Sequence, residues 1–223
     1  MTPSLQVVIP LFPGFTALDG VGPYEILQRL PSVEVTFIAH RRGEVRNDRG
    51  SLGMAADATF DEFPRPDVVV FPGGPGTRDL QSDQTVLAWI RQAHTTTRLT
   101  TSVCTGSLVL GAAGLLTGLA ATTHWACTAE LAAHGAVPTP QRVVELPEHR
   151  IITSAGVSAG IDMALRLVEL LVDRTAAEAV QLMVEYDPRP PFDAGSPATA
   201  GAAARSRAAE YRDRRDGSGG PRS

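Results

Sequence analysis

The chain has 223 residues and a formal net charge of −4, and 43% of its residues are hydrophobic. These proportions fit a soluble protein of the cytoplasm, and the acidic balance argues against nucleic acid as a partner, because nucleic-acid-binding domains carry a strong basic excess. No stretch approaches the roughly 18 apolar residues that span a bilayer and no basic region precedes an apolar one at the N-terminus, so we expect neither a membrane partner nor export.

Short β-branched runs and helical patterns alternate along the chain. In the first part we expect a strand over residues 5–9, a helix from about 21–23 to 30, a strand over 33–39, a hairpin or excursion over 41–53 and a strand over 67–71. In the second part we expect a helix over 85–94, a strand over 99–103, a helix over 105–113, a strand over 151–153 and a helix over 159–172. Pro23 suits the first turn of its helix, and Pro31 ends that helix.

Strands that alternate with helices of this length predict an α/β fold, in which a mostly parallel sheet is sandwiched by helices in a flavodoxin-like arrangement. In such sheets ligands bind at the carboxyl ends of the strands. Three segments leave the predicted strands at that edge, over residues 12–20, 72–76 and 102–106. We therefore expect the functional site where these three segments converge.

The last part of the chain has a different composition. An extended, proline-rich segment follows Tyr186, and residues 201–223 are rich in Ala, Arg, Gly and Ser. Terminal segments of this kind are often poorly ordered. We expect one domain over residues 1–197 and a flexible C-terminal tail over residues 198–223.

Cys104 is the strongest candidate for a reactive side chain. It lies between a predicted strand and a predicted helix, with small residues two positions before and after it, Ser102 and Gly106. A nucleophile elbow needs this spacing, because the strained turn leaves no room for larger neighbours. The positive end of the helix dipole would favour the thiolate. The alternative is a buried cysteine that packs as a small hydrophobe, which is also the simplest interpretation of Cys127.

Two further groups belong at the same edge of the predicted sheet. Gly73 and Gly74 end the preceding strand, and a glycine N–H there, with that of Thr105, could form an oxyanion hole beside the thiol; an ordinary glycine turn is the alternative. Asp19 is the only carboxylate of the first strand exit, and a carboxyl group beside a thiolate can act as a proton donor. By itself, an aspartate before a helix is more often a cap.

Several local stretches resemble the ThiJ/PfpI superfamily and, within it, the isonitrile hydratases. They are Phe12–Gly14 with Leu18–Asp19 and Gly22–Pro23, Pro72–Gly74, Thr101–Leu116, Ala121–Trp125, Ala159–Asp162, and Pro190–Phe192 with Ala194–Pro197. The resemblance covers about residues 5 to 197 and implies a class I glutamine amidotransferase-like domain and a homodimer. Transcription regulators share much of the cysteine stretch, but the remaining residues are too few for their DNA-binding domain.

The resemblance implies a hydro-lyase that adds water to an isonitrile, without a cofactor. Cys104 is its nucleophile, Asp19 its acid and base, and Thr105 a residue that positions substrate or water. The thiol would add to the electrophilic carbon to form a thioimidate, which water converts to an N-substituted formamide. His124, in the Ala121–Trp125 stretch, is a secondary candidate beside Gly73 and Gly74, because a structural histidine is the commoner situation.

The sequence also departs from the relatives in ways that bear on function. Residues 153–158 contain less glycine than is usual in isonitrile hydratases, which leaves the shape of the pocket open. PfpI proteases have a histidine directly after the cysteine, where this chain has Thr105, so a protease is disfavoured. The remaining histidines lack zinc-type spacing, and no metal is expected. A glyoxalase or deglycase, or a non-catalytic ligand or redox sensor, remains the alternative.

Overall fold

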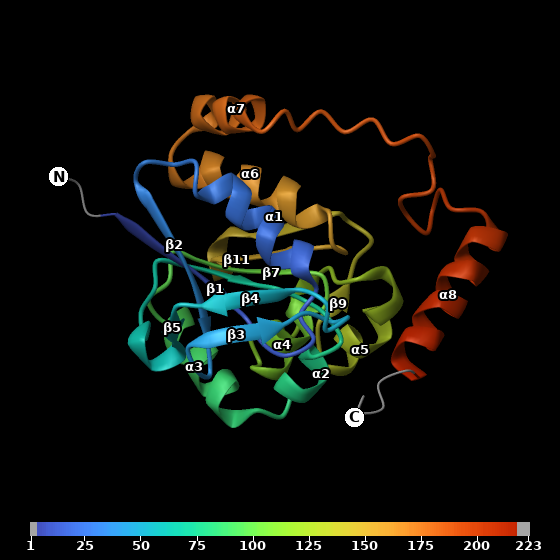
Figure 1. Ribbon diagram of the computed structural model, residues 1–223, viewed down its shortest axis with the longest axis horizontal. Coiled ribbons are helices and arrows are strands. Elements are labelled where there is room, and N and C mark those ends of the chain that lie inside the picture. Colours follow the sequence, from blue (N-terminus) through green and yellow to red (C-terminus); the bar gives the residue numbers. More distant parts are fainter. Residues whose placement is uncertain (1–3, 218–223) are drawn as a thin grey trace. The chain divides into compact units, whose positions relative to one another are not determined.

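The computed structural model describes residues 4–217 of the chain, with side chains up to residue 212, and its centre is a seven-stranded sheet (Figure 1). The strand order is β10-β11-β7-β6-β1-β2-β5, and all neighbours are parallel except β10 and β11. The strands are β1 (Leu5–Pro10), β2 (Val33–Ala39), β5 (Ala58–Thr59), β6 (Val68–Phe71), β7 (Leu99–Val103), β10 (Val143–Leu146) and β11 (Ile151–Ser154). The predicted α/β class and its mostly parallel sheet are confirmed.

Helices cover both faces of this sheet. α1 (Ala17–Leu27) and α6 (Ala159–Leu171) lie on one face, and α3 (Gln84–His94), α4 (Gly106–Ala112) and α5 (Thr128–Ala133) lie on the other (Figure 1). Central strands are therefore buried on both faces, as the fully buried β6 illustrates, and two apolar clusters form, one on each side. This double burial explains why β6 is apolar throughout rather than alternating, whereas the equally central β7 buries Thr100, Thr101 and Ser102.

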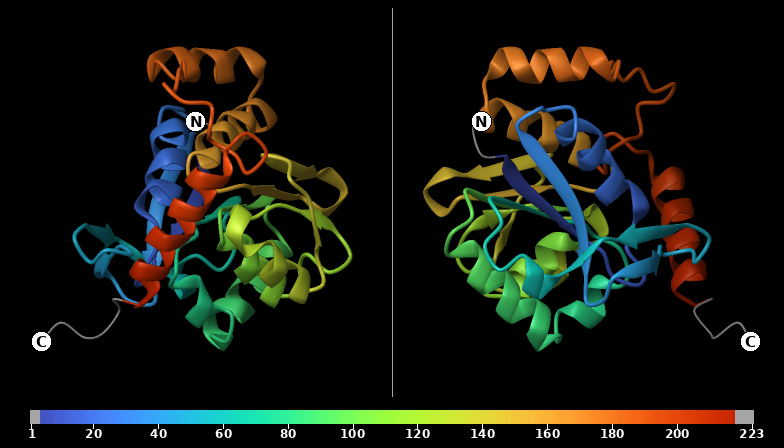
Figure 2. Two further views of the ribbon diagram at one scale, coloured as in Figure 1. Left: turned by 90° about the vertical axis from the view of Figure 1, so that its right-hand side faces the viewer. Right: turned by 60° about the vertical axis from the view of Figure 1, so that its left-hand side comes forward.

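Smaller elements complete this part of the structure. The segment over residues 41–53 contributes to a hairpin of β3 (Gly43–Arg46) and β4 (Gly53–Ala56), as predicted, and Figure 2 shows it standing out from the central sheet. The others are β8 (Ala120–Ala121) paired with β9 (Val137–Pro138), the short helix α2 (Thr77–Leu80), three single 3₁₀ turns over Phe60–Glu62, Trp125–Cys127 and Pro147–His149, and helix α7 (Arg174–Met183).

The first helix differs from its predicted bounds. α1 begins at Ala17 rather than near Val21, and it ends at Leu27 rather than Leu30. Thr16 is its N-cap, and Pro23, expected in the first turn, lies in the interior. Pro23 lies where α1 approaches α6 closely, since a Cβ added to Gly160 of α6 would stand only 3.3 Å from the Pro23 ring.

The chain divides into two units, over residues 1–185 and 186–223. The second unit begins with an extended segment and contains helix α8 (Ala202–Gly217), which lies within the predicted tail over 198–223. Residues 218–223 of that predicted tail lie outside the described residues. The domain bounds and the flexibility of the tail stay predictions.

Candidate active site

The three predicted strand exits meet at the carboxyl edge of the sheet. They follow β1, β6 and β7, which are neighbours in the sheet. Backbone hydrogen bonds join the first exit to the second, since the Thr16 N–H donates to the Gly73 carbonyl at 2.8 Å and the Gly76 N–H donates to the Gly14 carbonyl at 3.2 Å. The convergence expected from the sequence is therefore present, and it brings Cys104, Asp19, Gly73 and Thr105 together.

Cys104 occupies the sharp turn between β7 and α4. Its φ of 57° lies in the left-handed region, which costs a non-glycine residue about 1–2 kcal/mol. Its N–H donates to the Ser154 and Ala155 carbonyls at 3.0 and 3.1 Å, so the strained turn is held from β11. Gly106 must be small, because a Cβ there would stand 2.2 Å from the Phe71 carbonyl oxygen. A strained turn with a small residue two positions after the cysteine is what a nucleophile elbow requires, and the role of Cys104 as a nucleophile stays a prediction.

Asp19 lies in the first turn of α1 and is completely buried. It does not cap the helix, because Thr16 occupies the N-cap position. Instead, its Oδ2 accepts a hydrogen bond of 2.9 Å from the Gly73 N–H. A charge in the core is expensive unless it has partners. Burial of a carboxyl group at this edge of the sheet thus points to a chemical role rather than a capping role.

Gly73 is the point where the other groups meet. A Cβ on this residue would stand 2.5 Å from the Thr105 nitrogen, 2.8 Å from Asp19 Oδ2 and 2.8 Å from Cys104 Cβ. Real Cβ atoms do not approach other atoms this closely. The carboxyl group and the cysteine can therefore lie beside each other only because residue 73 has no side chain.

Gly74 and Thr105 bond to each other. The Gly74 N–H donates to Thr105 Oγ1 at 2.8 Å, and that hydroxyl donates to the Gly74 carbonyl at 3.1 Å. Gly74 has a φ of 132°, and a Cβ on it would stand 2.4 Å from the Gly14 carbonyl oxygen, so only glycine fits. Since the Gly73 and Gly74 N–H groups both have side-chain acceptors here, their oxyanion role stays a prediction, as does the role of Thr105.

The pKa of the Cys104 thiol is raised well above its ordinary value. Burial is the largest cause and the negative charge of Asp19 the second, while the backbone N–H groups of Thr105 and Val157, which face the sulfur, act in the opposite direction. The helix dipole was expected to favour the thiolate, whereas burial and the Asp19 charge raise the pKa of the thiol. The thiol and the carboxyl group therefore compete for ionisation.

Two residues that sequence reasoning did not assign also contact Cys104. Val157, with a φ of 46°, presents its N–H to the sulfur, and it belongs to the segment over 153–158 whose composition departs from the relatives. Thr123 donates its hydroxyl to the Cys104 carbonyl at 3.1 Å. Its place directly before His124 in a stretch shared with the family was the only signal in the sequence.

His124 packs against the segment over residues 153–158. Its Nδ1 accepts a hydrogen bond of 3.3 Å from the Ala126 N–H, and its ring lies 5.5 Å from that of Trp125, centre to centre. The same ring packs against Gly156, where an added Cβ would stand 2.7 Å from His124 Cδ2. These contacts place His124 against the residue that precedes Val157. A direct role in binding substrate stays a prediction.

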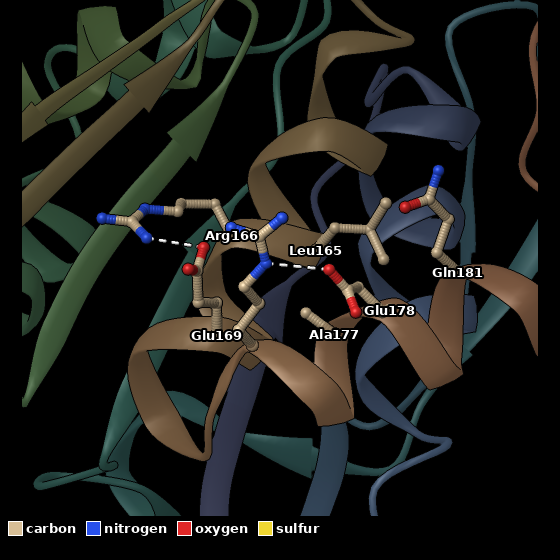
Figure 3. Close-up of a pocket in the computed structure, with 7 residues that line it drawn as sticks. Leu165, Arg166, Glu169, Ala177, Glu178 and Gln181 are labelled. Carbon is tan, nitrogen blue, oxygen red and sulfur yellow. Dashed lines mark hydrogen bonds and ion pairs between the residues drawn. The ribbon is translucent and has the colours of Figure 1, made fainter.

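A separate hollow of about 380 Å³ lies between α6 and α7 (Figure 3). Its charged side chains are paired: Arg166 bonds to Glu145 and Glu169, and Arg174 bonds to Glu178. The hollow contains none of the candidate site residues. Among the side chains of residues 4–212, no cluster of three or more metal-binding groups occurs, and no described helix is long and apolar enough to cross a membrane.

A parallel sheet with helices on both faces, and a strained, buried cysteine beside a buried carboxyl group at its carboxyl edge, defines a class of cysteine-centred α/β proteins. The sequence pattern of the DJ-1/PfpI family matches residues 5–170, and the chain belongs to this family. The resemblance found in the sequence is thereby confirmed.

Individual relatives agree with this assignment. The chain is 46% identical over 210 residues to the isonitrile hydratase of Pseudomonas putida, which covers 92% of this chain and 91% of that protein. A crystal structure of a THiJ/PfpI family protein from Pseudomonas syringae matches with a TM-score of 0.89 and 42% identity, over 95% of this chain and 87% of that one. The transcriptional regulator GbdR of Pseudomonas aeruginosa is 34% identical over 137 residues, covering 61% of this chain but 37% of that protein.

Proposed function

We propose that this protein is an isonitrile hydratase, a hydro-lyase that adds water to an isonitrile and releases an N-substituted formamide. The observation that carries the proposal is the meeting of Cys104 and Asp19 around Gly73, in a chain 46% identical to an isonitrile hydratase over nearly its whole length. An isonitrile needs a nucleophile and a proton at the same carbon atom, and this pair of side chains can supply both.

In the first step the pair of side chains shares one proton. The proposed resting state has this proton on sulfur, because burial and the Asp19 charge raise the pKa of the thiol, and it makes Asp19 the base. As sulfur attacks the isonitrile carbon, Asp19 takes the thiol proton and delivers it to that carbon. A C–S bond and a C–H bond form, and the product is a thioimidate bound to Cys104. The N–H groups of Thr105 and Val157 stabilise the charge that develops on sulfur.

In the second step water adds to the carbon of the thioimidate C=N bond. Asp19 accepts one proton from the water as the C–O bond forms and passes it to the nitrogen, which gives a tetrahedral adduct with a hydroxyl group and an N–H group. The C–S bond then breaks as the C=O bond forms, and the hydroxyl proton passes through Asp19 to the departing sulfur, so the formamide leaves and the thiol and the carboxylate are restored. Asp19 thus acts as base and then as acid in each proton transfer. The Thr105 hydroxyl, now bonded to Gly74, would turn toward the water, and the Gly74 N–H it releases would face the oxygen.

The proposal also covers the substrate, the cellular compartment and the oligomeric state. A small isonitrile is the substrate, and this chain's own thiol and carboxyl group with water supply every group that reacts. We propose that the protein is cytoplasmic, because the composition fits a soluble protein and the reactive thiol needs a reducing compartment. We also propose a homodimer, which rests on the family resemblance alone. Size-exclusion chromatography with light scattering measures the oligomeric state directly.

The test is turnover of cyclohexyl isocyanide, followed by loss of the isonitrile and appearance of N-cyclohexylformamide. We expect activity in the wild type, none in Cys104→Ala, and a loss of at least about 100-fold in Asp19→Ala. Cys127→Ala is the matched control, because this second cysteine is also buried but lies outside the elbow. An inactive wild type, or an active Cys104→Ala variant, would contradict the proposal.

The same experiment separates the alternatives. A glyoxalase or deglycase would form lactate from methylglyoxal with the same two residues. A ligand or redox sensor would bind or be oxidised once per molecule, whereas an enzyme regenerates its thiol after each turnover. Methylglyoxal is therefore assayed beside the isonitrile, and product is counted per Cys104 thiol.

A further inference from the structure

The peptide bond between Cys104 and Thr105 links the candidate nucleophile to one of the two amides that face it. A trans peptide is planar, and its C=O and N–H groups point in opposite directions. The N–H of this peptide, which belongs to Thr105, faces the Cys104 sulfur. Its carbonyl, which belongs to Cys104, therefore points away from the sulfur. Whatever binds that carbonyl fixes the direction of the N–H.

Two hydroxyl groups bind the Cys104 carbonyl. Ser107 Oγ donates to it at 3.1 Å from the first turn of α4, so this bond is local and moves with the turn. Thr123 Oγ1 donates to it at 3.1 Å from a distant part of the chain. Thr123 is 3% exposed, and the N–H of its neighbour Thr122 donates to Thr153 Oγ1 of β11 at 2.9 Å. The second hydroxyl is thus anchored to the sheet.

We propose that Thr123 is a positioning residue of the active site, whose hydroxyl holds the Cys104–Thr105 peptide so that its N–H stays directed at the sulfur. A hydrogen bond to a carbonyl also polarises the amide, which strengthens the N–H as a donor. The catalytic consequence rests on the proposed isonitrile hydratase function. The effect on the pKa of the thiol does not rest on that function, because it needs only the Cys104 sulfur and the Thr105 N–H.

The other amide that faces the sulfur is held differently. The peptide before Val157 has its carbonyl, that of Gly156, bonded by the Ala159 N–H at 3.3 Å, at the start of α6. That contact is between backbone atoms, and no substitution removes it without disturbing the helix. The Thr105 amide is held through a side chain, and it can be tested by changing one hydroxyl group.

The experiment compares Thr123→Val, which removes the hydroxyl at nearly constant shape, with Thr123→Ser, which keeps it. Thr101→Val is the matched control, because Thr101 is completely buried and its hydroxyl donates to the Val69 carbonyl of β6 at 2.9 Å. The first measurement is the pH dependence of iodoacetamide alkylation at Cys104, followed by mass spectrometry of the peptide that contains it. The second is kcat and KM for cyclohexyl isocyanide.

For Thr123→Val, we expect the alkylation profile to move to higher pH by about half a pH unit, and kcat to fall about 10-fold with KM within about twofold. Thr123→Ser restores both values, and Thr101→Val leaves both at the wild-type level although it loses a buried hydrogen bond of similar length.

An unchanged alkylation profile in folded Thr123→Val overturns the proposal, and so does an equal shift in Thr101→Val, which would mean general loosening of β7. If wild type does not consume the isonitrile but Thr123→Val still shifts the profile, the positioning role stands and the proposed hydratase function fails.

Discussion

The two edges of the central sheet each contain a residue other than glycine in the left-handed region, and they use that conformation differently. Cys104, at the carboxyl edge, has a φ of 57°, and Arg150, at the amino edge, has a φ of 55°. Both turns adjoin strand β7 or its neighbour β11. The cost in backbone energy is therefore similar, about 1–2 kcal/mol at each position.

At the amino edge, the side chain bonds to the protein. The Arg150 guanidinium donates to the His94 carbonyl at 2.9 Å and to the Thr97 carbonyl, which lie at and just beyond the end of α3. The last turn of a helix leaves four carbonyls without intrahelical partners, and besides Arg150 the His94 carbonyl accepts a long hydrogen bond of 3.5 Å from the Thr97 hydroxyl. The left-handed turn at Arg150 therefore stabilises a helix end.

At the carboxyl edge, the backbone of the strained residue forms these bonds instead. The Cys104 N–H has two acceptors, and the Cys104 carbonyl accepts from the Ser107 N–H and from the hydroxyls of Ser107 and Thr123. The sulfur faces two backbone amides and the nearby Asp19 charge. Similar backbone strain thus accompanies a bonded side chain at the amino edge and, under the proposed function, a side chain that meets the substrate at the carboxyl edge. Three substitutions test this difference.

Gly73→Ala should have the largest effect, and on activity. The new methyl group would overlap with the Thr105 nitrogen, Asp19 Oδ2 and Cys104 Cβ, so these groups must move apart. We expect at least about a 100-fold loss of kcat/KM for the isonitrile. Gly114→Ala is the control: Gly114, unlike Gly73, has a positive φ, but it has no atom within 4 Å of an added Cβ, so the variant should lose stability through backbone strain and keep its activity. Equal losses of activity in both variants would contradict the prediction.

Arg150→Ala should reduce stability without affecting the active site. Loss of the guanidinium bonds should lower the free energy of unfolding by about 2 kcal/mol, measured by urea denaturation, while activity per folded molecule stays unchanged. Arg150→Gly removes the same bonds but relieves the left-handed backbone, so it should be more stable than Arg150→Ala by about 1 kcal/mol. A loss of activity in folded Arg150→Ala would show that the two edges are coupled.

His94 should give the smallest effect, a pH dependence of stability at the amino edge. Burial, and then the charges of Arg150 and His149, lower the pKa of His94 below its ordinary 6.5 in the folded protein. The unfolded chain therefore binds more protons just below pH 6.5, and stability falls as the pH drops through that range. We expect the melting temperature to fall between pH 7.5 and pH 5, and to fall less in His94→Gln. An equal slope in the variant would assign the effect to other groups.

Much of the fold could be predicted, because central parallel strands carry apolar residues on both faces and therefore stand out in the sequence. The bounds of α1 could not, since Pro23 is the strongest local start signal while the actual start at Ala17 is stabilised by the Asp19 N–H donating to the Thr16 carbonyl. Strand β10 was also missed. It is a short, half-exposed antiparallel strand that depends on pairing with β11.

The sequence predicted those site residues whose side chains are themselves reactive. It did not predict the residues that contribute through backbone groups or through contacts formed only in the folded protein. Cys104 and Asp19 stand out because a thiol and a carboxylate are reactive groups at strand exits. Val157 contributes only an amide N–H, and any residue type but proline has one. Thr123 contributes a hydroxyl to a carbonyl 19 positions away, and that pairing exists only after β8 and β11 have come together.

The hydrogen bonds of Cys104 also have a consequence for how the protein opens. Its N–H pairs with carbonyls of residues 154 and 155, and its carbonyl pairs with residue 123, so three segments far apart in the chain must separate before this turn can be released. Amide protons held this way exchange with solvent only through large-scale unfolding. The Cys104 amide proton should therefore be among the slowest to exchange. The same hydrogen bonds would hold the thiol in fixed surroundings until the sheet itself unfolds.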